Sequence, residues 1–253
     1  MTRTNPNEPG LAALGEARLL TPIILKTRRD AEWPPGEQCF YLLASSGLFM
    51  CREHRFFRSC VEAPRYPAEL EEQEAFLEPN FPRVPRRPIE QIVGFFGHVW
   101  EEHGGEAAVL LAWNDRTERV EVIVPEQVAT VRRSYYGDRY PIGLHYSVPS
   151  NLPPHTVVYG DVHSHCDFAA YSSATDRDDE VYRSGLHAVV GRLNDETPEF
   201  HVEAVVDGTR FRLDTRIVFG SYRERSRDFP REWLERVKVE EQASLWSRQG
   251  GYR

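Results

Sequence analysis

The chain has 253 residues, of which 40% are hydrophobic and 28% are charged, and this balance is typical of a globular protein. The formal net charge is −8, because 39 acidic residues outnumber 31 basic ones, and this argues against a general nucleic-acid binder. The sequence has no apolar run of about 18 residues that would predict a membrane span. It also lacks an apolar N-terminal segment typical of signal peptides, so we expect a cytoplasmic protein with four reduced cysteines.

The first part of the chain, residues 1–62, is predicted to be a small β-rich domain. Short polar breaks at 45–47 and 52–54 suit hairpin turns. Strands are expected over residues 20–26, 39–44, 47–52 and 55–61. Residues 63–87 are rich in proline, which neither a helix nor a central strand tolerates, and we predict a linker here, with a helical turn or two within 69–78.

Residues 88–220 are predicted to form a second domain, of the α/β or α+β class. Apolar side chains recur at helical spacing from Ile89 to Trp100, which predicts a helix over 89–103 that ends at Gly104. Another helix is expected over 176–184 and a loop over 140–154. Strands are expected over 106–113, 119–124, 156–162, 186–192, 200–207 and 210–213, the last two joined by a hairpin turn at Asp207-Gly208.

The remaining residues, 221–253, are highly charged. We predict a C-terminal helix over 231–247 and a tail after it. The buried side of that helix would be formed by Trp233, Leu234, Val237 and Leu245.

The residues most informative about chemistry lie between 160 and 176. His163 and His165 stand two residues apart at the end of a predicted strand, so their side chains point to the same side and can bind one ion. Asp176 follows after a loop and can add a carboxylate. Zinc favours such nitrogen and oxygen ligands, and catalytic zinc sites keep a further position for water. We therefore predict a Zn²⁺ site formed by His163, His165 and Asp176.

These residues resemble the signature of the JAB/MPN (JAMM) zinc metalloproteases, which is His-x-His, seven residues, Ser, two residues, Asp. The match runs without a gap from His163 through Ser173 to Asp176. The resemblance covers roughly residues 88–219. The chain departs from the family pattern at Asp161-Val162, where an aromatic pair is common, and at Cys166, where proline is frequent.

The resemblance implies a mixed β-sheet flanked by helices, with a three-layer core like that of cytidine deaminases. It also implies a catalytic glutamate on an early strand, and Glu106 opens the apolar run 106–113. An acidic residue at the start of an apolar run is expected to have a partner or a function, because burying an unpaired carboxylate costs free energy. Glu106 would move a proton from the attacking water to the leaving amine, and Ser173 would donate a hydrogen bond to the oxyanion.

The chain looks similar to the prokaryotic, deubiquitinase-like branch of the family, which is associated with bacterial ubiquitin-like conjugation systems. This implies a zinc isopeptidase or peptidase that cuts after the tail of a ubiquitin-like protein. E1- and E2-like enzymes would be further partners, and antiphage defence the setting. Two alternatives stay open: release of cysteine or another adduct from a sulfur-carrier protein, and a non-catalytic MPN scaffold. A RadC-type protein is disfavoured by the acidic balance and the absence of an HNHP sequence, and a nucleobase deaminase is disfavoured because PCxxC is absent.

Several of these residues also have simpler interpretations. Ser173-x-x-Asp176 before a helix is a capping pattern, which is compatible with a metal ligand in the first helical turn. Cys166 is interpreted as a loop residue, and a ligand or redox role stays open. Segments 134–154 and 167–172 are candidates for contacting a substrate tail. Four more histidines are expected to be ordinary surface or strand residues: His145, His155, His187 and His201.

Overall fold

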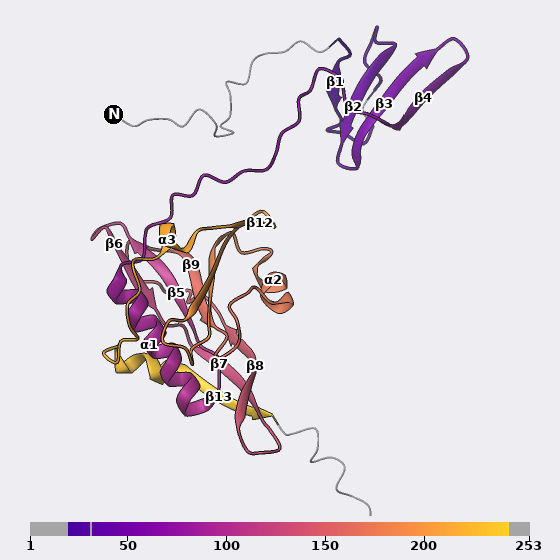
Figure 1. Cartoon of the computed structure of the whole chain (residues 1–253). Helices are drawn as coiled ribbons and strands as arrows, with labels where there is room; N and C mark the ends of the chain where they lie inside the picture. The colour runs from indigo at the N-terminus through magenta and orange to yellow at the C-terminus, as the bar shows by residue number, and fades with distance from the viewer. Residues whose placement is uncertain (1–19, 31, 243–253) are drawn as a thin grey trace, which may run out of the picture. The chain divides into compact units, whose positions relative to one another are not determined.

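The structure is a computed structural model that describes residues 20–30 and 32–242. The chain divides into two compact units, the first ending in the sequence at Phe76 and the second starting at Leu77 (Figure 1). Each unit has its own sheets and its own buried side chains. Among the described residues, no helix is both long and apolar enough to cross a membrane.

The N-terminal unit is a single four-stranded sheet. Its strands lie in the order β1-β2-β3-β4, with β1 parallel to β2 and the other pairs antiparallel. Their bounds are Ile23–Leu25, Cys39–Ala44, Gly47–His54 and Phe57–Glu62. The predicted strands are therefore present. The second hairpin turns at residues 55–56 rather than at 52–54, because β3 continues to His54 in register with Phe57.

The proline-rich segment after β4 contains no helix or strand from residue 63 to residue 83. The helical turn predicted within 69–78 is absent, which agrees with the low helix tolerance of proline-punctuated sequence. The segment ends at Val84, which is fully buried and forms an isolated parallel bridge with Phe219. Helix α1, Arg86–His103, begins directly afterwards.

The second unit is built around a six-stranded mixed sheet in the order β12-β11-β10-β9-β5-β6. Neighbours are antiparallel except β9 and β10, which are parallel and are connected through helix α2. In the same order the strands are Thr209–Arg212, Glu199–Val206, Gly185–Gly191, Thr156–Ser164, Ala108–Asn114 and Arg119–Ile123. Helices α2 and α3 span Ala174–Glu180 and Thr215–Val218. The α+β class expected from the sequence is confirmed.

The hydrophobic core lies between α1 and one face of this sheet. Ile89, Ile92, Phe95, Phe96 and Val99 of the helix are fully buried. They belong to one cluster with alternate residues of four strands: Val109, Leu111, Val162, Leu186, Ala188, Val190, Val202 and Ala204. Because side chains alternate along a strand, the odd-numbered residues 161 and 163 of β9 must point to the face that α1 does not cover.

A second sheet of three strands has the order β13-β7-β8. These strands are Val237–Gln242, Gln127–Arg133 and Arg139–Tyr146. Strand β8 replaces the first half of the loop predicted over 140–154. Pro141 lies where the β7–β8 register shifts, on the edge strand of the sheet, and these are positions that accept proline.

The predicted C-terminal helix is present only over its first six residues, and the prediction is wrong from Val237 to Gln242. Residues Arg231–Arg236 form a 3₁₀ helix, and Val237 then starts strand β13, which pairs in parallel with β7. Trp233, Leu234 and Val237 are nevertheless partly buried against the core, as their apolar character indicated. The pairing of β13 with β7 outweighs local helix propensity here. Residues 243–247 lie outside the described part.

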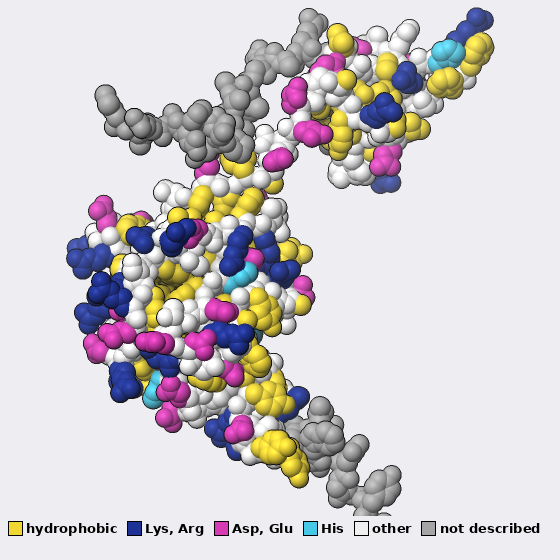
Figure 2. All heavy atoms as spheres, viewed as in Figure 1, with side chains coloured by type: hydrophobic (Ala, Val, Ile, Leu, Met, Phe, Trp, Pro, Cys, Tyr) yellow, Lys and Arg dark blue, Asp and Glu magenta, His cyan; other side chains and the backbone are white. Residues whose placement is uncertain are grey.

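The surface of the second unit carries both signs of charge. Figure 2 shows Lys and Arg side chains intermixed with Asp and Glu on the visible face. Many of these side chains form ion pairs, such as Arg225 with Glu101 and Arg236 with Glu126. Both pairs include solvent-exposed partners, so each contributes at most about 1 kcal/mol to stability.

Candidate metal centre

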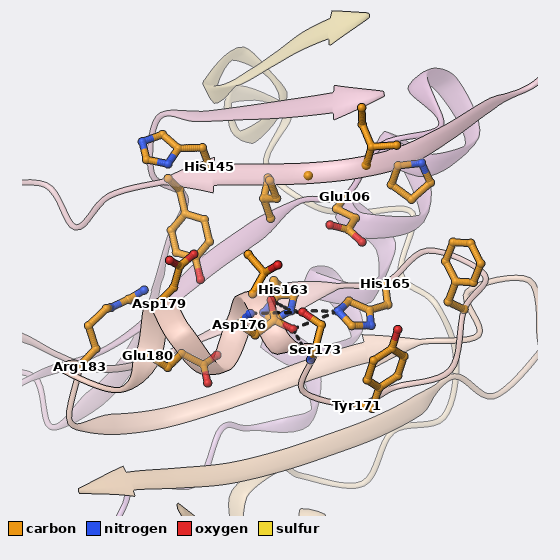
Figure 3. A pocket seen from close by; sticks show the side chains of 17 residues that line it. Glu106, His145, His163, His165, Tyr171, Ser173, Asp176, Asp179, Glu180 and Arg183 are labelled. Carbon is orange, nitrogen blue, oxygen red and sulfur yellow. Dashed lines mark hydrogen bonds and ion pairs between the residues drawn. The ribbon is translucent and has the colours of Figure 1, made fainter. Parts of the chain in front are cut away.

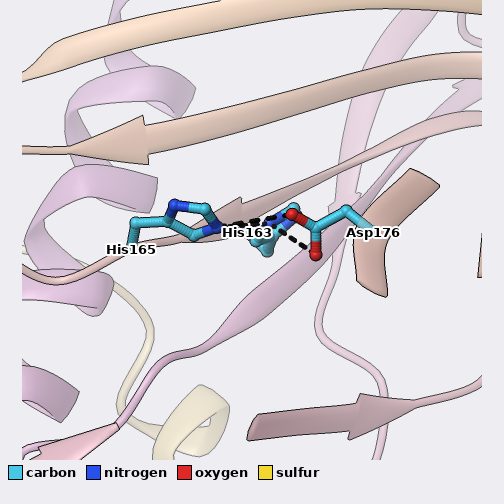
Figure 4. A group of neighbouring side chains, drawn as sticks. All are labelled: His163, His165 and Asp176. Atoms are coloured by element: carbon cyan, nitrogen blue, oxygen red, sulfur yellow. Dashed lines mark hydrogen bonds and ion pairs between the residues drawn. The ribbon is translucent and has the colours of Figure 1, made fainter. Parts of the chain in front are cut away.

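The three predicted ligands converge on the face of the sheet opposite α1. His163 lies near the end of β9, His165 follows just beyond the strand, and Asp176 lies in the first turn of α2. Both imidazoles are buried, being 5% and 6% exposed. Figure 4 shows the Asp176 carboxylate facing both rings, with dashed lines running to it. The structure therefore brings together the three side chains that the spacing singled out.

The spacing of the three side chains fits a tetrahedral metal ion. The Nε2 atoms of His163 and His165 are 3.3 Å apart. The carboxylate oxygens of Asp176 are each 3.5 Å from one of these nitrogens. Ligand atoms at tetrahedral corners, with zinc bonds of about 2.0–2.2 Å, would stand about 3.3–3.6 Å apart. The nearest nitrogen–nitrogen and nitrogen–oxygen distances are thus of that size, and the three side chains form a group able to bind a metal ion.

Electrostatics also favours a cation between these side chains. Burial alone would lower the pKa of His163, but the Asp176 carboxylate outweighs it and raises that pKa overall. Burial alone would raise the pKa of Asp176, whereas hydrogen bonds with His163, His165 and Ser173 hold it well below its usual range. Asp176 is therefore ionised near neutral pH. The Asp176 carboxylate thus favours positive charge beside it, which a bound metal ion would supply.

Ser173 and Asp176 form a reciprocal capping box at the start of α2. The Asp176 N–H donates to Ser173 Oγ at 3.2 Å, and the Ser173 N–H donates to Asp176 Oδ2 at 2.7 Å. This fixes the carboxylate that faces the histidines. Because Ser173 Oγ accepts this bond, its own hydroxyl proton remains available to another acceptor. Capping and a role at the site are thus compatible, as the sequence indicated.

Glu106 does not open the strand as predicted. Strand β5 begins at Ala108, and Glu106 lies in the connection that follows α1. Gly104 ends the helix in a left-handed conformation, with φ of 68°, and turns the chain toward the sheet. Figure 3 shows the Glu106 carboxylate directed toward His163, His165 and Asp176. Burial raises the pKa of Glu106, the two histidines lower it and Asp176 raises it, with a net increase.

A buried ionic network next to His163, on the same face of the sheet, was not predicted from the sequence. Asp161 is fully buried and accepts a 2.6 Å bond from Arg183 Nη2. His187, expected to be an ordinary strand residue, is 3% exposed, with Nδ1 3.2 Å from Asp161 Oδ2 and Nε2 2.8 Å from the Arg183 carbonyl. Burial would raise the pKa of Asp161, but His187 and Arg183 lower it overall.

The network continues along the helix α2 side of the sheet. Arg210 Nη1 contacts Glu180 at 2.8 Å and Glu203 at 3.0 Å, and Ser172 donates to Glu203 at 3.0 Å. Glu180 also forms a second potential cation group with Asp161 and His163. The Asp161 carboxylate, however, is already neutralised by Arg183 and His187. The network therefore holds β9, β10 and α2 in place around the metal-binding group.

An open pocket of about 520 Å³ leads to the three side chains. It is lined by Glu106, Ser173 and the three side chains of the metal-binding group, and one wall is formed by residues 141–146 of β8 (Figure 3). Tyr171 packs edge-on against His165, with ring centroids 5.0 Å apart, at the opposite side. Both segments proposed to contact a substrate tail, 134–154 and 167–172, therefore contribute residues to this pocket.

Cys166 lies beside the site without belonging to the metal-binding group. It is fully buried, and its Sγ is directed at the Gly105 carbonyl oxygen, 3.3 Å away. Burial, with a contribution from Glu106, raises the pKa of this thiol, which keeps it uncharged. The residue has a positive φ of 52° in the turn that leads out of β9. These contacts agree with a structural loop residue.

The family comparison matches the region that holds this site. Residues 91–205 match the family described as prokaryotic homologs of the JAB domain. This region is a prokaryotic-type JAB/MPN domain. The matched residues include all three potential ligands as well as Glu106 and Ser173. The comparison with curated proteins gave no match.

Solved structures similar to the chain include a JAB1/MPN domain protein from Archaeoglobus fulgidus, which is 19% identical in sequence with a TM-score of 0.32. The match covers 52% of this chain and 94% of that chain. A protein from Desulfitobacterium hafniense is 13% identical with a TM-score of 0.31, and the match covers 67% of this chain and 99% of that chain. A Salinibacter ruber protein is 19% identical with a TM-score of 0.29, and the match covers 55% of this chain and 91% of that chain. Likenesses this weak carry no conclusion about the site of the JAB domain.

Proposed function

We propose that the JAB domain is a zinc-dependent isopeptidase or peptidase acting in the cytoplasm. The observation that carries this proposal is the convergence of His163, His165 and Asp176 within ligand distance of one another, with the Glu106 carboxylate directed at them. A metal-binding group with a basic carboxylate beside it and an open pocket above it has the parts that amide hydrolysis requires.

In this proposal His163, His165 and Asp176 hold the zinc ion. Zinc supplies a Lewis acid that polarises a carbonyl and makes water nucleophilic near neutral pH. Glu106 accepts the proton of the attacking water and returns it to the leaving nitrogen, a role that its raised pKa favours. Ser173 Oγ–H donates to the oxyanion that forms on the substrate. No covalent bond to the enzyme is needed.

The substrate we propose is the extended C-terminal tail of a ubiquitin-like protein, free or conjugated. Strand β8 supports this choice because it is an edge strand of its sheet and also forms a wall of the pocket. Edge strands bind extended peptides through main-chain hydrogen bonds. E1- and E2-like partners and a setting in antiphage defence are parts of the same proposal.

The β8 wall gives a prediction about substrate binding. Ile142 is 37% exposed and lines the pocket, so Ile142→Asp should remove apolar contact with the tail and raise KM about tenfold, the lower end of the range for losing one apolar contact. Because Ile142 is remote from the proton transfers, kcat should change far less. The matched control is Val206→Asp, at an equally exposed residue outside this pocket, which should leave both constants unchanged. An unchanged KM in Ile142→Asp would contradict this placement of the tail.

The function is tested by cleavage of ubiquitin-like fusions with the full chain. We expect cleavage that stops when a chelator removes zinc and resumes when zinc is restored. Release of a small adduct from a sulfur-carrier protein, with no cleavage of larger fusions, would favour the first alternative. Zinc-loaded protein without hydrolysis of either substrate class would favour the scaffold.

A further inference from the structure

Two cysteines of the N-terminal unit face each other across a strand pair. Cys51 of β3 stands directly opposite Cys60 of β4. Their Sγ atoms are 3.1 Å apart, and both thiols are free. Neither residue contributes to the metal centre, which lies in the other unit.

The backbone between these cysteines has the geometry that a disulfide requires. The Ala63 N–H donates to the Leu48 carbonyl at 2.9 Å, and these residues lie three register steps from the cysteine pair. Because hydrogen-bonded and non-hydrogen-bonded pairs alternate in an antiparallel ladder, Cys51 and Cys60 form a non-hydrogen-bonded pair, with Cα atoms about 4.5 Å apart. Disulfides span Cα separations of about 4.4–6.8 Å, so a bond needs only side-chain rotation.

The two thiols differ sharply in accessibility. Cys51 is fully buried, whereas Cys60 is exposed on the edge strand. Burial, together with the neighbouring Cys60 thiol, raises the pKa of Cys51 to about 12, so this thiol stays protonated. An oxidant in solution therefore reacts with Cys60 first, and Cys51 reacts in the second, intramolecular step.

We propose that Cys51 and Cys60 form a redox modification site, which low-molecular-weight disulfides convert into a reversible cross-strand disulfide. The Cys60 thiolate attacks one sulfur of the small disulfide, forming a mixed disulfide and releasing one small thiol. Cys51 then attacks the Cys60 sulfur, loses its proton and displaces the second small thiol. Two protein thiols are oxidised while one small disulfide is reduced to two thiols. The proposal is independent of the hydrolytic function.

The other two cysteines serve as internal controls. Cys39 is in register with Arg52, one step from the Phe40–Cys51 pair, so its side chain points to the opposite face of the sheet. Its Sγ contacts Met50 Sδ at 3.6 Å. Cys166 is buried in the JAB domain, against the Gly105 carbonyl.

The test is exposure of the full chain to oxidised glutathione, followed by unfolding, alkylation and peptide mapping. We expect the four alkylatable cysteines to fall to two, with a Cys51–Cys60 bridge that dithiothreitol reverses. Cys51→Ala should trap glutathione on Cys60, Cys60→Ser should prevent any bridge, and Cys39→Ser should bridge like the wild type. Four alkylated cysteines in the oxidised wild type, or a bridge containing Cys39 or Cys166, would overturn the proposal.

Discussion

Glu106→Gln is expected to reduce hydrolysis by about 100- to 10,000-fold, the range contributed by general acid–base catalysis. Glutamine has the size of glutamate but cannot accept the water proton or return it to the leaving amine. The loss should appear in kcat, because the pocket that binds the substrate remains intact. Steady-state cleavage of a ubiquitin-like fusion measures this effect, and zinc content should equal that of the wild type because Glu106 is not a ligand in this account.

The control for this variant is Glu102→Gln, which makes the same chemical change on an exposed residue in the last turn of α1. It should cleave at the wild-type rate. Glu106→Gln with near-normal kcat would assign the proton transfers to another group. Glu106→Gln that loses zinc as well as activity would show that Glu106 is a ligand rather than a base.

Asp161→Ala should destabilise the JAB domain by about 3 kcal/mol, the lower end of the range for breaking a buried ion pair. The substitution leaves Arg183 and His187 without the carboxylate that they both contact. The lower end applies because the Arg183 side chain is 37% exposed and can turn toward water. Urea unfolding followed by circular dichroism gives the free energy of unfolding.

The matched control is Asp195→Ala, in an exposed turn, which should change that free energy by less than about 0.5 kcal/mol. Zinc affinity measured on the folded Asp161→Ala protein reports a second consequence. If the network positions His163, affinity should fall about 10- to 100-fold, as for other partners that orient metal ligands. A variant as stable as the wild type would show that the network is dispensable.

The metal-binding group could be predicted because its three residues lie close together in the sequence. His163 and His165 share a face by strand alternation, and Asp176 is brought back by one loop and the first turn of α2. The capping pattern at Ser173 was readable for the same reason, since it depends on residues three apart. Glu106 is different, because only the position of β5 beside β9 brings its segment to the site.

The second sheet was missed because its pairings are long-range. Strand β13 pairs with β7 across more than 100 residues of sequence, and its charged sequence Val237–Gln242 has no strong strand pattern by itself. Pro141 and Gly143 made β8 resemble a loop, although a bulged edge strand accepts both. The pocket wall that β8 forms could therefore not be derived from local propensity.

The sequence also carries one indication of the Asp161 network. Asp161 is an acid within the otherwise apolar and aromatic run 157–162, and such a residue requires a buried partner. Alternation places it on the same face as His163. The partners themselves, Arg183 and His187, are fixed only by the parallel pairing of β9 with β10, in which His187 stands opposite Asp161.

The central claim is that His163, His165 and Asp176 bind zinc, and the zinc content of the purified full chain tests it most directly. It should be compared with His163→Ala/His165→Ala and with the control His54→Ala/His155→Ala, which removes two exposed histidines away from the site. Our account predicts near-stoichiometric zinc in the wild type and in the control, and none in the first variant. Wild-type protein that stays metal-free when supplied with zinc, or equal zinc in all three proteins, would contradict it.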